Sequence, residues 1–246
     1  MKQYGLIGKS LKHSFSQSYF EEKFAKEKIL DCQYELFELD DIQQLPTVLH
    51  NHPYLEGFNV TIPYKQSIIP FLDELDLEAE QVGAVNTVRV LRSGQQVHTK
   101  GFNTDIIGFR ESLVGKILPP KALILGTGGA AAAVSHVLDQ EGITCQFVSR
   151  SERPGTLTYE ALTPDIIREH KLIVNCTPIG TMENQCPPLP YAAIGADHFL
   201  YDLVYNPAKT KFLEEGEKRH ATIQSGLQML HLQADAAWNI WQTNKR

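Results

Sequence analysis

A run of small residues, Gly126-Thr127-Gly128-Gly129-Ala130, is the feature of this 246-residue sequence that points most directly to chemistry. It follows an apolar stretch, residues 122–125, that predicts a buried strand, and it opens an alanine-rich stretch that predicts a helix. At such a turn glycine permits a tight bend and a close ligand approach, and the unpaired N–H groups of the helix start attract an anion. We therefore predict a dinucleotide pyrophosphate site, although glycine-rich turns are common and the third glycine of GxGxxG is replaced.

Ser149, Arg150 and Ser151 follow the next apolar stretch, residues 145–148, at the distance from the glycine turn where ribose recognition is expected. An arginine flanked by hydroxyl groups suits a 2′-phosphate by charge and can stack on adenine. We therefore predict NADP as the cofactor. Glu152 keeps NAD open as an alternative, because a carboxylate at this place binds the ribose hydroxyls in NAD enzymes.

A polar loop, Asn175-Cys176-Thr177-Pro178, comes after the strand predicted for residues 172–175. Ligands of open α/β sheets bind beyond the carboxyl ends of the strands, so Thr177 is a candidate contact at the nicotinamide end of the cofactor. On spacing alone, an ordinary loop shaped by Pro178 and Gly180 fits the sequence nearly as well.

Three stretches nearer the N-terminus, residues 13–16, 58–65 and 83–87, alternate polar with apolar side chains. Their hydroxyl and amide groups suit a pocket for a small polyhydroxylated acid, in which Ser14 and Ser16 bond a carboxylate. Taken singly, each stretch has an ordinary alternative, such as a serine that caps a helix. Together with a nearby hydride donor they make more chemical sense as a substrate site.

Asn59 and Thr61 fall on one face of a predicted strand, so both are expected to project into one cleft. The opposite face carries Phe58, Val60 and Ile62. Lys65 follows on the next turn, and Asp105 opens a predicted helix between two domains. We expect Lys65 and Asp105 to form a proton-transfer pair, the alternative for Asp105 being a favourable first-turn carboxylate.

Short apolar stretches alternate with amphipathic ones along the chain, which predicts an α/β fold with parallel strands. In the first half we expect strands at residues 4–8, 34–38, 57–60, 87–91 and 96–99, the last two joined by 92–95, and helices at 16–27, 45–50 and 75–81. In the second half we expect strands at residues 122–125, 145–148, 172–175 and 199–202, and helices at 129–140 and 209–218. A helix over 104–114 marks the boundary, and a last helix runs from 226 to about 241.

The bulk composition excludes several classes of protein. A net charge of -6 and a pI near 5.8 give no general attraction to nucleic acid or to anionic lipid. No apolar stretch approaches the roughly 20 residues of a membrane span, so we expect a cytoplasmic protein. The four cysteines form no CxxC pair and are expected to be reduced, mostly buried thiols, and the nine histidines form no ligand motif, so no metal is expected.

Taken in order, these motifs resemble the shikimate dehydrogenase family over nearly the whole chain. The matching segments are residues 13–16, 59–65, 83–87, 101–108, 126–130, 175–178, 201–207 and 226–230, with Gln233. The resemblance implies an α/β substrate domain over residues 1–103 and a Rossmann-like NADP domain over 104–226, with a cleft between them. It also implies that the last helix, about 227–246, packs back onto the first domain. Gln17 stands where the family usually has proline.

The resemblance also implies the reaction and the residue roles. The reaction is the reversible reduction of 3-dehydroshikimate to shikimate by NADPH, in aromatic amino-acid biosynthesis. Lys65 matches the catalytic lysine, and Gly226 touches the nicotinamide end of the cofactor together with the loop that holds Thr177. The residues expected to hold the substrate carboxylate are Ser14, Ser16 and Tyr205, and those expected to contact its ring hydroxyls are Asn59, Thr61, Asn86, Asp105 and Gln233.

Two alternatives stay open. One is a quinate/shikimate dehydrogenase that uses NAD, which would differ in the cofactor loop and in pocket tolerance. The other is a non-catalytic metabolite-sensing homologue, against which the presence of both Lys65 and Asp105 argues. The small-molecule substrate is the only expected partner, and the sequence is compatible with a monomer or a homodimer.

Overall fold

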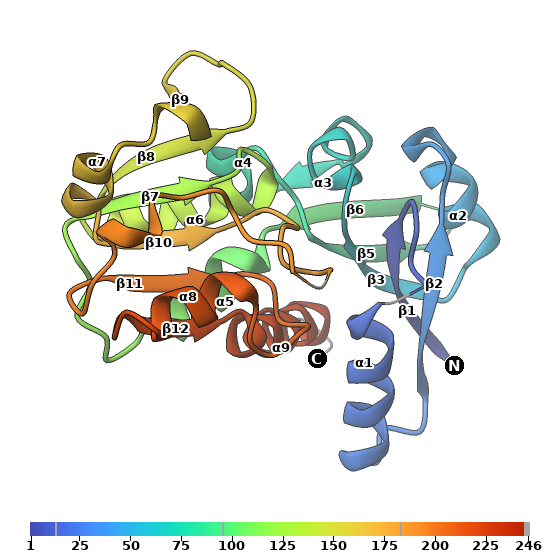
Figure 1. The fold of residues 1–246 in the computed structure, drawn as a ribbon. Coiled ribbons are helices and arrows are strands. Elements are labelled where there is room, and N and C mark those ends of the chain that lie inside the picture. Colours follow the sequence, from blue (N-terminus) through green and yellow to red (C-terminus); the bar gives the residue numbers. More distant parts are fainter. Residues whose placement is uncertain (13, 95, 183, 244–246) are drawn as a thin grey trace. The chain divides into compact units, whose positions relative to one another are not determined.

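The computed structural model describes residues 1–12, 14–94, 96–182 and 184–243 (Figure 1). The chain divides into two compact units. The first combines Met1–Thr104 with the residues from Ala234 onward, and the second is Asp105–Gln233. Each unit is built on a six-stranded sheet, so the expected α/β class is confirmed. None of the helices in the described ranges is long and apolar enough to cross a membrane.

The first unit contains a mixed sheet with the strand order β2-β1-β3-β5-β6-β4. Its strands are β1 (Lys2–Gly8), β2 (Cys32–Glu38), β3 (Leu55–Val60), β4 (Glu74–Leu75), β5 (Thr87–Ser93) and β6 (Gln96–Phe102). Its helices are α1 (Phe15–Lys26), α2 (Leu45–Asn51), α3 (Tyr64–Ser67) and α4 (Leu77–Val82), with short 3-10 turns at Ile42–Gln44 and Ile69–Phe71. β1 runs parallel to β2 and β3, whereas β5 runs antiparallel to β3 and β6.

The second unit contains an all-parallel sheet with the strand order β12-β11-β10-β7-β8-β9, which is the order of a dinucleotide-binding Rossmann fold. Its strands are β7 (Lys121–Leu125), β8 (Thr144–Ser149), β9 (Thr156–Thr158), β10 (Leu172–Asn175), β11 (Phe199–Asp202) and β12 (Thr222–Ser225). Its helices are α5 (Thr104–Ser112), α6 (Gly129–Gln140), α7 (Pro164–Glu169) and α8 (Lys211–Glu217), with 3-10 turns at Tyr159–Ala161 and Tyr191–Ala193. The last helix, α9 (Leu227–Gln242), contributes residues to both units.

Alternating side chains give the sheet of the second unit two buried faces. Leu123 and Leu125 pack with Phe212 of α8 in one core cluster. On the other face, α5 lies against β11: the Phe109 and Tyr201 ring centroids are 5.1 Å apart, and Ser112 Oγ lies 2.8 Å from the Tyr201 hydroxyl. The sheet that carries the predicted cofactor loops is therefore covered on both sides.

Several predicted boundaries were wrong, each for a local reason. The helix expected at 75 begins at Leu77, because Leu75 pairs with Gly101 and the Asp76 side chain accepts from Glu78 N at 3.3 Å. The helix expected at 209 begins at Lys211, where Thr210 is the N-cap and accepts from Leu213 N. Ile62 was expected opposite Asn59 on a strand, but β3 ends at Val60, and the Ile62 side chain is 72% exposed.

Three elements of the second unit were not predicted, namely β9, α7 and β12. The cysteines also differ from the expectation: all four lie in the described ranges and none forms a disulfide, but each is only partly buried.

The first unit has a core on each face of its sheet, and α9 closes one of them. Tyr4 packs there with Phe20 of α1 and with Trp241 of α9, and the Tyr4 and Trp241 rings stack with centroids 4.9 Å apart. The Trp241 indole Nε1 donates to Val88 O at 3.0 Å. A Cβ atom at Gly57 would lie 2.3 Å from the Trp241 ring, so β3 and the indole meet only because residue 57 has no side chain.

We predict that Gly57→Ala destabilises the protein by about 1–3 kcal/mol, because the added methyl group overpacks the buried indole. Urea denaturation followed by fluorescence measures the change. Gly195→Ala is the matched control: its Cβ would meet only Asp197 Oδ1, at an ordinary 3.6 Å. Equal stability of the two variants would contradict the close packing.

Candidate functional site

The predicted substrate residues of the first unit gather at one edge of its sheet. Because β1, β2 and β3 are parallel, their carboxyl ends lie along the same edge. Ser14 and Ser16 come after β1, at the start of α1, and Thr61 comes directly after β3. Asn86 precedes β5, which starts at this edge because it runs antiparallel to β3. Lys65 lies in α3, a few residues beyond the end of β3.

Asn59 is held by a buried hydrogen-bond network. The Tyr34 hydroxyl donates to Asn59 Oδ1 at 2.8 Å. Asn59 Nδ2 donates to Thr87 Oγ1 at 3.0 Å and to Asn86 O at 3.3 Å, so both of its N–H groups are engaged within the protein. Tyr34 lies outside the stretches that were singled out in the sequence, whereas Thr87 belongs to the stretch 83–87 but was not chosen as a site residue.

Asn86 joins this network to the end of β6. Its Oδ1 accepts from Thr104 N at 2.7 Å, from Thr104 Oγ1 at 3.1 Å and from Thr87 Oγ1 at 3.2 Å. A carbonyl oxygen with three donors is saturated, which fixes the amide plane. The same bonds hold Thr104, the residue before Asp105, in place.

Ser14 stands at the N-cap position of α1, yet no side-chain cap bond forms there among the described residues. Its Oγ is buried and has no hydrogen-bond partner in the described part of the chain. Ser14 is thus the N-cap residue of α1 by position, but its side chain does not cap the helix. Ser16 interacts with Tyr34, whose pKa is raised by burial and lowered in part by this serine. His13 lies outside the described residues.

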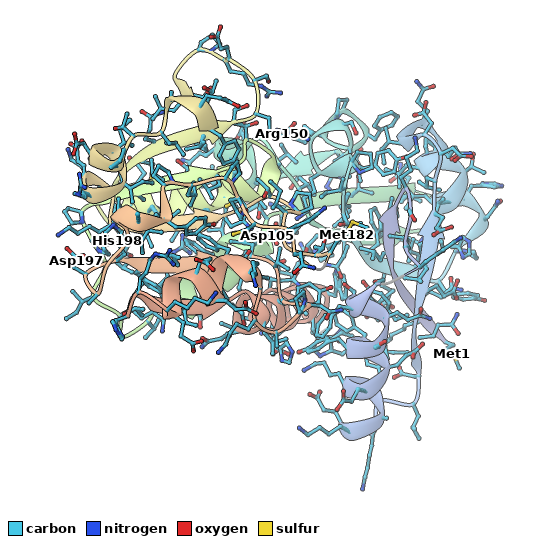
Figure 2. The ribbon with its side chains drawn as sticks, in the orientation of Figure 1. Met1, Asp105, Arg150, Met182, Asp197 and His198 are labelled. Atoms are coloured by element: carbon cyan, nitrogen blue, oxygen red, sulfur yellow. The ribbon has the colours of Figure 1, made fainter. Side chains whose placement is uncertain are left out.

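Lys65 and Thr61 are fixed through their backbones. Lys65 O accepts from Val85 N at 2.7 Å, which ties α3 to residues 83–87. Thr61 N donates to Ile7 O at 2.9 Å, and a Cβ at Gly8 would lie 2.6 Å from Thr61 Cγ2. Asp105, labelled in Figure 2, lies in the first turn of α5 and is 7% exposed. It belongs to the second unit, whereas Lys65 belongs to the first.

The predicted cofactor residues lie at the carboxyl edge of the sheet of the second unit. The glycine turn, Gly126 to Ala130, follows β7, and Thr177 follows β10. Ser149 ends β8 and is followed by Arg150 and Ser151. Because all six strands are parallel, these loops share one edge.

The geometry of the glycine turn fits a phosphate group. Gly126 has a φ of +111°, which favours glycine, and its N–H donates to Val148 O at 2.8 Å. Gly128 is the N-cap of the 12-residue helix α6, and no side chain of the described residues caps it. A Cβ at Gly128 would have no atom of the protein within 4 Å. The first N–H groups of α6, from Gly129 and Ala130 onward, are thus open to an anion.

Arg153 adds a cation to this turn that was not selected from the sequence. Its Nη1 donates to Thr127 Oγ1 at 3.3 Å. Arg150 is exposed, and Ser149 Oγ accepts from Ser151 N at 3.3 Å. An open hollow of about 510 Å³ lies beside Arg153, lined by residues of the loop after β8 and of β9.

A buried carboxylate, Asp202, anchors two loops of this edge. Asn175 Oδ1 accepts from Thr177 N at 3.1 Å and from Thr177 Oγ1 at 2.6 Å, while Asn175 Nδ2 donates to Asp202 Oδ1 at 2.9 Å. Asp202 also accepts from Val204 N and from Thr210 Oγ1. Burial raises the pKa of Asp202 to about 6, although these hydrogen bonds lower it in part.

The remaining predicted residues are also in the second unit. A Cβ at Gly226 would lie 2.3 Å from Leu203 O, so only glycine allows this approach to the loop after β11. Tyr205 lies in that loop, and burial raises the pKa of its phenol. Gln233 Nε2 donates to Leu230 O at 2.9 Å.

Other polar groups have structural partners. His198, labelled in Figure 2, accepts from Gly195 N at Nδ1, and its Nε2 lies 3.1 Å from Ile167 O, which satisfies the buried ring. Across the described ranges, no group of three or more His, Cys, Asp or Glu side chains is placed to hold a metal ion.

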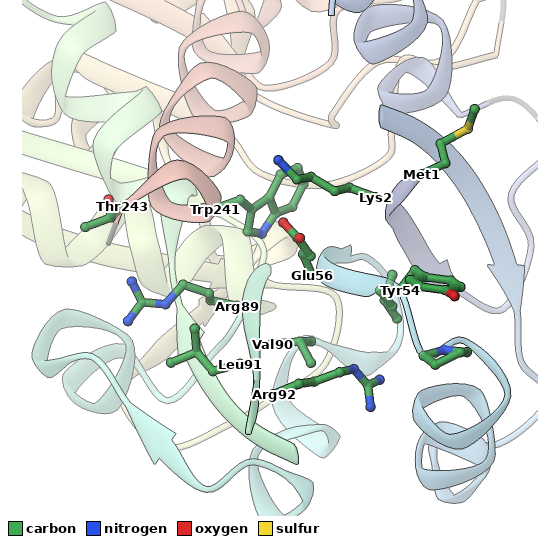
Figure 3. Close-up of a pocket in the computed structure, with 12 residues that line it drawn as sticks. Met1, Lys2, Tyr54, Glu56, Arg89, Val90, Leu91, Arg92, Trp241 and Thr243 are labelled. Carbon is green, nitrogen blue, oxygen red and sulfur yellow. The ribbon is translucent and has the colours of Figure 1, made fainter. Parts of the chain in front are cut away.

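A hollow of about 390 Å³ in the first unit is lined mainly by residues around β3 and β5 (Figure 3). Its cations do not converge, because Arg89 and Arg92 point away from each other. Arg92 donates to two main-chain carbonyls, and Lys2 pairs with Asp31 at 3.3 Å. This hollow therefore does not concentrate positive charge.

Comparison with known proteins shows what this chain is similar to. Residues 6–88 match the shikimate dehydrogenase substrate binding domain. A curated shikimate dehydrogenase (NADP(+)) of Caldicellulosiruptor saccharolyticus is 34% identical over 98% of this chain and 92% of its own length.

Solved structures agree with this likeness. A shikimate 5-dehydrogenase of Thermus thermophilus, in complex with NADP(H) and shikimate, is 31% identical, with a TM-score of 0.82 over 98% of this chain and 94% of that one. A quinate dehydrogenase of Corynebacterium glutamicum, in complex with NAD, is 25% identical, with a TM-score of 0.85 over 98% and 93%.

We predict that Asp202→Asn removes a pH dependence of stability between about pH 4 and pH 6. In the folded wild type the raised pKa keeps this carboxyl protonated in that window, whereas in the unfolded chain it ionises. The stabilising contribution is present below the unfolded value of 3.8 and is lost as the pH rises through about 6.

Urea denaturation at several pH values should show the wild type losing up to roughly 3 kcal/mol relative to Asp202→Asn across this window. Any constant effect of the amide on hydrogen bonding cancels in the pH dependence. A wild-type-minus-variant difference that stays flat from pH 4 to pH 7 would contradict the assignment.

Proposed function

The chain belongs to the shikimate dehydrogenase family, and from this premise we propose that it catalyses the reversible NADPH-dependent reduction of 3-dehydroshikimate to shikimate in the cytoplasm. The observation that carries the proposal is the placement of the motif residues. The substrate residues of the first unit and the cofactor loops of the second each lie at the carboxyl edge of their own sheet, where open α/β sheets bind ligands. A reaction between a dinucleotide and a small hydroxylated acid would use the motif residues at both edges.

We propose that the turn from Gly126 to Ala130 holds the pyrophosphate of NADP, since its helix start is uncapped and open. Ser149, Arg150 and Ser151 would hold the phosphorylated ribose, with Arg153 beside the turn as a further cation. Thr177 and Gly226 would position the nicotinamide end. NADPH, when bound, supplies the hydride to the ring carbonyl.

For the substrate, we propose that Ser14 and Ser16, with Tyr205, bind the carboxylate. The buried, unpartnered Oγ of Ser14 supports this role. The groups that would read the ring hydroxyls are Asn59, Thr61, Asn86, Asp105 and Gln233.

Asn59 and Asn86 would contact the ring hydroxyls in opposite ways, one as an acceptor and the other as a donor. Both N–H groups of Asn59 are engaged, so it would accept from a substrate hydroxyl through Oδ1. Asn86 Oδ1 already has three donors, so this residue would donate through its amide nitrogen.

We propose that Lys65 is the proton donor in the direction of carbonyl reduction. As the carbonyl is reduced, negative charge develops on its oxygen, and a protonated lysine amine can both stabilise that charge and supply the proton. In the reverse direction the neutral amine takes the proton back. Asp105 would orient the amine and contact the adjoining ring hydroxyl.

We predict that Lys65→Ala lowers kcat by roughly 100- to 10,000-fold, because proton donation and charge stabilisation are both lost. The Kd for NADPH, measured by fluorescence titration, should change little. Lys26→Ala, at an exposed position in the last turn of α1, is the control and should keep wild-type kcat. Near-normal turnover of Lys65→Ala would refute the assignment.

The initial rate of NADP⁺ reduction with shikimate tests the function itself, run beside NAD⁺ and beside quinate. We expect the highest kcat/KM for NADP⁺ with shikimate, because two arginines stand near the turn where a 2′-phosphate would bind. A preference for NAD⁺ with quinate would favour the activity named for the Corynebacterium relative. The absence of any nicotinamide absorbance change with either substrate would indicate a non-catalytic homologue.

A further inference from the structure

Tyr159 occupies a place in the second unit that no motif identified. It is the first residue of the 3-10 turn Tyr159–Ala161, directly after β9. β8 and β9 pair in parallel up to Ser149 opposite Thr158, and Arg150 and Tyr159 are the residues that follow this last pair. Tyr159 therefore stands at the carboxyl edge of the sheet, beside the residue proposed to bind the 2′-phosphate.

The side chain of Tyr159 is buried, but its hydroxyl is unsatisfied. The residue is 8% exposed, and its ring packs in a core cluster with Leu125 and Val148. The hydroxyl oxygen is buried and makes no hydrogen bond to any described residue. A buried hydroxyl without a partner costs stability, and native proteins rarely keep one without a function.

The surroundings of the hydroxyl indicate what it lacks. Burial raises the pKa of the Tyr159 phenol to about 12, against a lowering by the Arg150 charge, so at neutral pH the phenol is a hydrogen-bond donor. The Arg150 guanidinium is also a donor only. Cys176, the residue directly after β10, influences the same phenol, and a neutral thiol is a weak acceptor. Two strong donors thus share a region in which the described residues provide no acceptor to the phenol.

We propose that Tyr159 is a specificity-determining residue for NADP, which donates its buried hydroxyl to an oxygen of the 2′-phosphate next to Arg150. This inference rests on the proposed function, which places the phosphorylated ribose at the end of β8. An anionic oxygen is the acceptor that both donors lack, and a neutral donor adds a hydrogen bond without a further charge. The buried ring gives this donor a fixed direction that an exposed arginine does not have.

Tyr159→Phe tests the proposal, because it removes the hydroxyl and keeps the packed ring. Kd values are measured by isothermal titration with NADP⁺, with adenosine 2′,5′-bisphosphate and with AMP, which lacks the 2′-phosphate. We expect both 2′-phosphorylated ligands to bind about ten-fold more weakly or worse, with the Kd for AMP unchanged. The ligand-free variant should unfold at the same or a higher temperature, because the orphan hydroxyl is gone.

Tyr191→Phe is the matched control. Tyr191 is a part-buried tyrosine of the second unit, and its hydroxyl donates to Pro187 O at 2.8 Å. Its loss should lower the unfolding temperature and leave every Kd unchanged. This opposite pattern separates a ligand-binding hydroxyl from a structural one.

Two results would overturn the inference: a Tyr159→Phe protein that binds NADP⁺ as well as wild type does, or one that loses affinity for AMP and for adenosine 2′,5′-bisphosphate equally. Either leaves the proposed function intact, provided that wild type binds NADP⁺ and oxidises shikimate. Failure of wild type to bind NADP⁺ would remove the proposed function and this inference together.

Discussion

The direction of the strands is the constraint on which both candidate sites depend. In the second unit all six strands run the same way, and in the first the three strands β1, β2 and β3 do so. Loops that are far apart in the sequence are therefore brought to one edge of each sheet. Because both faces of each sheet are covered, that edge is the place where polar side chains can meet a ligand.

Hydrogen bonding at these edges separates the residues that shape the sites from those suited to contact a ligand. Tyr34, Thr87, Asn175 and Asp202 are engaged with other protein groups, and they fix amide planes and loop paths. The hydroxyls of Ser14 and Tyr159 are buried and have no partner among the described residues. A buried donor without a hydrogen-bond partner is costly, so the two hydroxyls indicate where a ligand could bind. A network whose members are all hydrogen-bonded indicates a rigid part of the structure.

Sequence patterns predicted the α/β class, most strands and the glycine turn, because apolar runs and strand-to-helix turns are local signals. Predictions failed where the deciding interaction was not local. The three-residue strand β9 exists only through pairing with β8, and α7 is too short to show a period. Its Thr163-Pro164 start was nevertheless a readable helix signal. Arg153 and Tyr159 could not be assigned from spacing, because their places follow from a loop path and from strand register.

The entry of Trp241 into the core beside Tyr4 has a consequence for biosynthesis. The first unit is discontinuous: its N-terminal part contains the whole sheet, but its hydrophobic face is completed only by the last helix. On the ribosome, the contiguous second unit is fully synthesised earlier than the residues that close the first. The aromatic surface around Tyr4 therefore stays uncovered on the nascent chain until the residues of α9 have been synthesised.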